Sequence, residues 1–141
     1  MSPNEVGVYK IIFKSEYQLY EFNFPYQLAV YSDGEGDTES LKNIGKNTQK
    51  KLILKSGDVV LLMTDGVFDN LFDIELEKIT NSLMLNVKPA QELAESIGHS
   101  AKNRSLQYHA NTPFIEGAKM CGKEFYGGKI DDITVVVAIM N

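Results

Sequence analysis

Short runs of aromatic and β-branched residues, separated by polar turns, fill the first third of the chain. Residues 6–13 and 17–24 are two such runs, and residues 26–32 form a third. This composition is typical of β-strands. Residues 33–49 contain three glycines and several acids but few residues that could be buried, which predicts a mobile surface loop. The pattern of ordered structure resumes at residues 50–55.

Two strongly apolar strands are predicted further along the chain. Residues 59–64, VVLLMT, follow a tight turn at 56–58 and are almost entirely apolar, which predicts a strand covered on both faces. Residues 133–140, ITVVVAIM, form the second strand, which is rich in β-branched side chains. The segment before it, residues 109–129, has no clear periodicity and is predicted to be irregular.

Two helices are predicted between these strands. Residues 73–85 place apolar side chains on one helical face, with Asp73 as the N-cap and further acids in the first turn. Residues 89–108 begin with Pro89, which suits the first helical position. Their apolar side chains follow the spacing of a buried helical stripe: Ala90, Leu93, Ala94, Ile97 and Ala101. Strands, then a helical pair, then a returning strand predict an α+β layered fold, and we interpret residues 1–141 as a single partial domain.

Composition and charge exclude several classes of protein. A chain of 141 residues that is 43% hydrophobic is long enough for a sizeable core. The net charge of −5 argues against binding to nucleic acid. Cys121 is the only cysteine, which excludes an internal disulfide and a Cys-rich zinc site. No apolar run approaches the roughly 20 residues that span a bilayer, and the N-terminus lacks the features of a secretion signal, so we expect a soluble, intracellular protein with no membrane span.

Acidic residues mark one end of each strongly apolar strand. Asp65, Gly66 and Asp69 follow the first strand, and Asp131 and Asp132 precede the second. If the strands are antiparallel neighbours, Asp65 and Asp131 meet at the same edge of the sheet. Two partly buried carboxylates repel each other unless one is protonated or a cation lies between them. Carboxylate oxygens select hard cations such as Mg²⁺ or Mn²⁺, and Gly66 lets the backbone turn and a ligand approach.

Turn chemistry offers a second interpretation of the same residues. Asp and Gly are common in turns, and Asp69 or Asp73 could cap the helix that follows. The pairing of two acidic strand ends strengthens the metal-site interpretation, but the pattern leaves both open. The acidic segment at 32–37 is interpreted as a solvated turn, and residues 126–129, YGGK, as a tight turn that aims Asp131.

Two segments also resemble a known family. Residues 57–70, GDVVLLMTDGVFDN, and 127–140, GGKIDDITVVVAIM, are similar to the two C-terminal signatures of the metal-dependent serine/threonine phosphatases, the PPM or type 2C family. The forms EFNFPYQL and GGKIDDIT look most like the branch of mitochondrial, T-cell-activation-type phosphatases. The resemblance implies an α-β-β-α sandwich of antiparallel sheets flanked by helices, with two Mg²⁺ or Mn²⁺ ions per full-length active site. It also implies phosphoserine or phosphothreonine on proteins as substrate. By the same match Asp65 and Asp131 would hold one metal ion, Asp69 a third and weaker one, and Gly66 and Asp132 would support the turn.

Other motifs of the family are missing from this chain. The upstream D-G-x-G-G motif, which supplies the metal-bridging Asp, is absent, as are the upstream Arg and His that act on the phosphate. No catalytic residue is therefore assigned, and we expect the C-terminal half of a family domain that is poorly active alone, in the mitochondrion or the cytoplasm. Its exposed apolar sheet face would favour a homodimer. Two alternatives stay open, a non-catalytic phosphatase-like interaction module and an unrelated α+β domain with turn aspartates and no specific Mn²⁺ binding.

Overall fold

A computed structural model describes residues 1–4, 7–26, 50–85 and 89–141. These fall into two compact units, the larger formed by Met1–Lys14 with Leu54–Asn141 and the smaller by Ser15–Ile53. Each unit is described by itself. The loop predicted at 33–49 and nearly all of the strand predicted at 26–32 lie outside the described residues.

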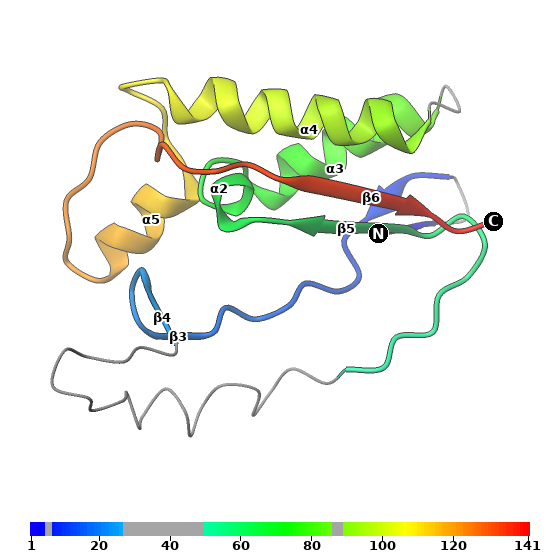
Figure 1. Cartoon of the computed structure of the whole chain (residues 1–141), viewed down its shortest axis with the longest axis horizontal. Helices are drawn as coiled ribbons and strands as arrows, with labels where there is room; N and C mark the ends of the chain where they lie inside the picture. The colour runs from blue at the N-terminus through cyan, green and yellow to red at the C-terminus, as the bar shows by residue number, and fades with distance from the viewer. Residues whose placement is uncertain (5–6, 27–49, 86–88) are drawn as a thin grey trace, which may run out of the picture. The chain divides into compact units, whose positions relative to one another are not determined.

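An antiparallel pair of strands forms the centre of the larger unit (Figure 1). β5 (Val59–Met63) pairs with β6 (Val135–Ile139), in a register that places Val59 opposite Ile139 and Met63 opposite Val135. The start of β6 therefore lies beside the end of β5. The sequence-based expectation that these strands are antiparallel neighbours is confirmed, and this register brings their acidic ends together.

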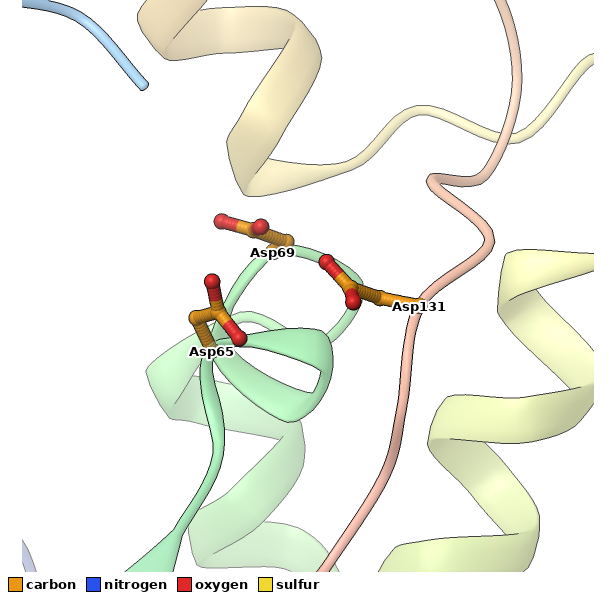
Figure 2. Close-up of side chains that lie close together, drawn as sticks. All are labelled: Asp65, Asp69 and Asp131. Atoms are coloured by element: carbon orange, nitrogen blue, oxygen red, sulfur yellow. The ribbon is translucent and has the colours of Figure 1, made fainter. Parts of the chain in front are cut away.

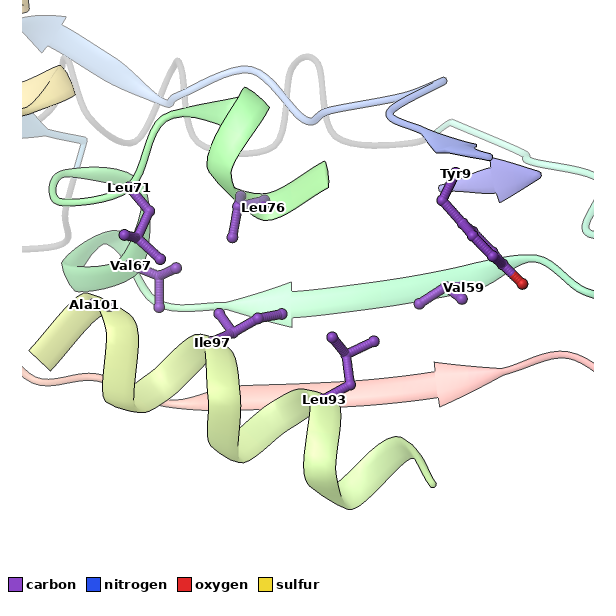
Figure 3. Close-up of a cluster of buried hydrophobic side chains, with 8 residues drawn as sticks. All are labelled: Tyr9, Val59, Val67, Leu71, Leu76, Leu93, Ile97 and Ala101. Carbon is purple, nitrogen blue, oxygen red and sulfur yellow. The ribbon is translucent and has the colours of Figure 1, made fainter. Parts of the chain in front are cut away.

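Two helices cover one face of this strand pair. α3 (Asp73–Met84) and α4 (Ala90–Ser105) pack on each other, and α4 also packs along β6 (Figure 1). The buried core lies between the helices and the strands (Figure 3), and eight residues form it: Tyr9, Val59, Val67, Leu71, Leu76, Leu93, Ile97 and Ala101. Each fully buried aliphatic side chain of this kind contributes about 1.5–3 kcal/mol of hydrophobic stabilisation.

The opposite face of the strand pair is open to solvent. Leu62 and Val136, which are partners in the register, are 65% and 52% exposed. The prediction that residues 59–64 are covered on both faces is therefore wrong for this chain, because the covering helices lie on one side only among the described residues. The separate expectation of an exposed apolar sheet face agrees with the structure.

The helix boundaries differ from the predicted ones by short steps. Asp73 is the first residue of α3 rather than its N-cap, a position that Phe72 takes. The Phe72 backbone N–H donates to the Glu75 carboxylate at 2.9 Å, which satisfies one of the free donors at this helix end. Pro89 likewise precedes α4 as its N-cap residue rather than starting the helix.

A further helix lies in the segment that the sequence predicted to be irregular. α5 (Pro113–Met120) begins after Thr112, whose buried hydroxyl accepts a hydrogen bond from the Ile115 N–H at 3.3 Å. The helix is short, but Thr-Pro at its start is a readable signal, since Thr caps helices and Pro suits the first helical position.

The N-terminal strands are much shorter than predicted. β1 (Ser2–Pro3) pairs with β2 (Tyr9–Lys10). Within β2, the Tyr9 N–H and C=O bond to the Asn81 side chain at 2.7 and 3.0 Å, and directly after β2 the Ile11 N–H donates to Glu77. Side chains of α3 therefore bind backbone groups of this segment that another strand could have bound.

The smaller unit contains a short hairpin. β3 (Leu19–Glu21) pairs with β4 (Phe24–Pro25). Asn23 in the turn has φ of 62°, a left-handed conformation that Asn tolerates better than most residues. The single strand predicted over 17–24 is thus broken by a turn. Among the described residues no helix is long and apolar enough to cross a membrane.

Candidate metal centre

Two of the candidate carboxylates lie at the ends of α2 (Asp65–Phe68), a single helical turn that starts where β5 ends: Asp65 is its first residue and Asp69 its C-cap. Thr64 is its N-cap residue, and the Asp69 N–H donates to the Asp65 carbonyl at 2.7 Å. Residues four apart lie on the same side of a helical turn. The side chains of Asp65 and Asp69 therefore lie close together (Figure 2).

The third carboxylate comes from the segment that leads into β6. The Thr64 hydroxyl donates to the Asp132 carbonyl at 2.9 Å and accepts from the Thr134 N–H at 2.9 Å. This double contact fixes the entry of one strand against the exit of the other. One oxygen each of Asp65, Asp69 and Asp131 then lies within 4.8 Å of the others (Figure 2). The structure thus brings together the three acids that the sequence singled out.

Gly66 allows this close approach. A Cβ at Gly66 would lie 2.5 Å from the Asp132 carbonyl oxygen and 3.2 Å from the Asp131 Cβ, so a side chain would push the two segments apart. Gly66 is part of α2, so its lack of a side chain, rather than a sharp turn, is what the site uses. Asp132 contributes through its backbone, since its side chain is exposed and its N–H donates to Asp131 Oδ1 at 2.9 Å.

A lysine that the sequence analysis passed over lies among the three carboxylates. Lys129 Nζ is 2.5 Å from Asp69 Oδ2, 2.9 Å from Asp131 Oδ2 and 3.9 Å from Asp65 Oδ2. Its side chain is only 19% exposed, and its ammonium lies 5.1 Å from the centre of the Phe114 ring. The only sequence signal for it is a lysine two residues before Asp131, which also fits a surface turn.

The backbone of Lys129 is held by a buried asparagine. Asn70 is fully buried, and its amide nitrogen donates to the carbonyls of Gly66 at 2.9 Å and Lys129 at 2.8 Å. Its amide oxygen accepts from the Lys129 N–H at 3.0 Å. This side chain replaces a strand partner for Lys129 and ties α2 to the segment that carries the lysine. It is a second site residue that the sequence analysis missed.

A pair of glycines lies directly before the lysine, close to the end of α4. Gly127 has φ of +78° and forms a bend within residues 126–129, the segment predicted to be a tight turn. A Cβ on Gly128 would lie 2.1 Å from the Arg104 carbonyl oxygen, and the Gly128 N–H donates to the Gln107 carbonyl at 2.8 Å. Only a residue without a side chain fits there, so the position of the following Lys129 is set by close backbone packing.

The electrostatics of the cluster follow from burial and from this one ammonium. The pKa of Asp69 is raised, first by burial and then by the nearby charges of Asp65 and Asp131. The hydrogen bond from Lys129 acts in the opposite direction but does not cancel this effect. The Lys129 hydrogen bond lowers the pKa of Asp131. Burial acts to lower the pKa of Lys129, but its hydrogen bonds to Asp69 and Asp131 outweigh this and raise it. One cation therefore compensates part of a threefold negative charge.

The donor set suits a hard divalent ion. All three ligands are carboxylate oxygens, which Mg²⁺, Mn²⁺ and Ca²⁺ prefer. In an octahedral Mg²⁺ site with bonds of about 2.1 Å, opposite ligands are about 4 Å apart. The ligand oxygens of the three acids lie up to 4.8 Å from one another, which is within about 1 Å of that ligand–ligand distance. The residues present fit such an ion.

Comparison with known proteins finds relatives of this chain, although no protein-family model matches it. It is 38% identical over 128 residues to the probable protein phosphatase 2C 55 of Arabidopsis thaliana, covering 90% of the chain and 26% of that protein. It is 34% identical over 132 residues to the protein phosphatase PTC7 homolog fig of Drosophila willistoni, covering 92% of the chain and 42% of that protein. The chain is a relative of the type 2C protein phosphatases.

A solved structure supports the same relationship. The photosystem II phosphatase PBCP matches with a TM-score of 0.73 and 25% identity, over 94% of this chain and 52% of that one. The predicted fold class, an incomplete type 2C α+β fold, is therefore confirmed. The 5-azacytidine resistance protein azr1 of Schizosaccharomyces pombe is 36% identical over 92% of the chain and 45% of its own length. The chain thus spans less than half the length of these three sequence relatives.

Proposed function

We propose that this chain supplies one part of the metal centre of a type 2C protein phosphatase, which hydrolyses phosphoserine and phosphothreonine on proteins. The observation that carries the proposal is the convergence of Asp65, Asp69 and Asp131 on a chain related to this family. The three carboxylates come from two separate segments, and Lys129, the one ammonium that contacts them, compensates only part of their charge, which favours a bound divalent cation.

Each carboxylate has a distinct place in the proposal. Asp65 and Asp131 come from the two strand ends and hold one Mg²⁺ or Mn²⁺ ion between them. Asp69, the C-cap of α2 and more buried than Asp65, would hold a third and weaker ion. Gly66 and the Asp132 backbone keep the two segments at the required distance.

When bound, ions in such a centre lower the pKa of a coordinated water and hold the phosphoryl group for in-line attack. The contribution of this chain is to fix ligand positions before binding, through the Thr64 contacts and the Asn70 hydrogen bonds. The described residues contribute no assigned general acid, so we expect slow hydrolysis by this chain alone.

The open sheet face belongs to the same proposal. Leu62 and Val136 present an apolar surface that a second copy of the chain could cover, in line with the expected homodimer. Sedimentation equilibrium over a range of concentrations tests this, and a clean monomer at the highest concentration would contradict it.

The proposed site is tested by Mn²⁺ binding and Mn²⁺-dependent hydrolysis. We expect Mn²⁺ to bind the chain and binding to fall at least tenfold in Asp65→Asn and Asp131→Asn. Asp73→Asn is the matched control, because Asp73 is a half-exposed carboxylate paired with Lys14 outside the cluster. Equal binding in all three variants would overturn the metal site. Turnover of a phosphopeptide at the rate of an intact family member would show that the chain assembles a working centre by itself, and would refute the expected slow hydrolysis.

A further inference from the structure

We propose that Lys129 is the internal cation of the carboxylate cluster, which a divalent ion has to displace, so that this lysine sets the metal affinity of the site. The inference rests on the proposed metal centre and adds a competitor to it. It assigns a positioning and affinity-setting role to a residue for which the sequence pattern gave no function.

The ammonium lies where a metal ion would compete with it. Lys129 Nζ contacts one oxygen each of Asp69 and Asp131 at hydrogen-bond distance, and Asp65 lies 3.9 Å away. Asp69 and Asp131 are also two of the three acids whose ligand atoms lie within 4.8 Å of one another. The lysine therefore contacts the same carboxylates that would bind the metal. A divalent ion bound at about 2–2.5 Å from these oxygens would lie next to the ammonium. Two cations in this partly buried place repel each other, so full occupancy requires that the lysine side chain leaves.

The structure holds the backbone of Lys129 in place but leaves its side chain able to move. Asn70 binds both the N–H and the C=O of Lys129, and Gly128 packs against the end of α4. These contacts involve only the backbone, so they persist when the side chain turns away. A lysine stem has four flexible carbons, and this one is 19% exposed, which gives the ammonium a path to solvent.

Without the ammonium the three carboxylates would face one another uncompensated. Lys129 therefore stabilises the metal-free protein and, by the same contacts, weakens metal binding. The free energy by which Lys129 stabilises the metal-free protein must equal the free energy by which it weakens metal binding. Both belong to one thermodynamic cycle.

The test compares Lys129→Met with the wild type by Mn²⁺ titration and by thermal unfolding. Methionine keeps the unbranched stem but removes the charge. Lys119→Met is the matched control, since Lys119 is an exposed lysine on α5 outside the cluster. We expect Lys129→Met to bind Mn²⁺ at least tenfold more tightly than the wild type, and Lys119→Met to bind within twofold of it.

Unfolding experiments separate displacement from simple repulsion at a distance. We expect Lys129→Met to melt below the wild type without metal, and this difference to disappear at saturating Mn²⁺ because the lysine contacts are then broken in the wild type too. A melting difference that persists at saturating Mn²⁺ would overturn displacement, as would equal or weaker binding by Lys129→Met when the wild type binds. If neither protein binds Mn²⁺, or if Asp131→Asn does not reduce binding, the proposed metal centre itself fails and this inference with it.

Discussion

Replacing Gly66 by alanine tests whether close packing of two backbone segments builds the site. The new Cβ would lie 2.5 Å from the Asp132 carbonyl oxygen. A carbon and a carbonyl oxygen tolerate about 3.3 Å at closest, so the two segments must separate by about 0.8 Å. Overpacking against a backbone atom costs up to about 3 kcal/mol, and alanine recovers about 1 kcal/mol of helix propensity in α2. We therefore expect a net loss of about 2 kcal/mol of unfolding free energy.

The same displacement moves Asp65 away from Asp131. We expect Mn²⁺ affinity to fall about tenfold or more, because a misplacement near 1 Å disrupts a preformed ligand set. Thermal unfolding should show a melting temperature lower by about 4–8 °C. Isothermal titration with Mn²⁺ measures the affinity.

Gly98→Ala makes the same chemical change at a matched position. A Cβ there meets only Val135 Cγ2 at 3.9 Å, which is ordinary contact, inside α4. We expect this variant to be more stable than the wild type by about 0.5–1 kcal/mol, with unchanged Mn²⁺ affinity. If Gly66→Ala were as stable as Gly98→Ala and bound Mn²⁺ equally well, the packing argument would be refuted.

Two further predictions concern polar groups that are not metal ligands. Asn70→Ala removes three buried hydrogen bonds to Gly66 and Lys129, so the unfolding free energy measured in urea should fall by about 2–4 kcal/mol. Surface substitutions change this free energy by about ±0.5 kcal/mol. A loss below about 0.5 kcal/mol would therefore contradict the role of Asn70. Asp58 has a pKa below its ordinary 3.8, first because Ser2 donates to it at 2.6 Å. A lowered folded pKa stabilises the protein above pH 3.8 and loses that effect as the pH falls through the folded value. Wild-type stability should therefore fall from about pH 5 to pH 3 more steeply than that of Asp58→Asn, and equal slopes in urea titrations would refute the assignment.

The position of the site was predictable because it depends on a short-range pattern. A strand of apolar residues that ends in Asp65, and another that starts after Asp131, need only an antiparallel pairing to bring the two acids together. Each strand carries that information in its own sequence. The two helices between them were equally readable, since a buried stripe repeats at helical spacing whatever it packs against.

Segments whose structure depends on side-chain partners elsewhere in the chain were predicted less well. Asn81 and Glu77 of α3 bind the backbone of Tyr9, in β2, and of Ile11, directly after it, where the sequence predicted a longer strand. The open sheet face was predicted to be covered because apolar strands are commonly buried on both sides, whereas α3 and α4 cover one side and Leu62 and Val136 on the other side are exposed.

Local pattern thus determined where the acidic strand ends lie and which family the chain resembles. Tertiary structure decided what surrounds them. Lys129 reaches Asp69 across a sequence separation of 60 residues, and Asn70 reaches Lys129 across 59. Such contacts depend on the direction of side chains from segments that meet only after folding, and lysine or asparagine in a turn has the same local sequence whether it points to solvent or into a site. The charge balance of the site is therefore a property of the folded chain.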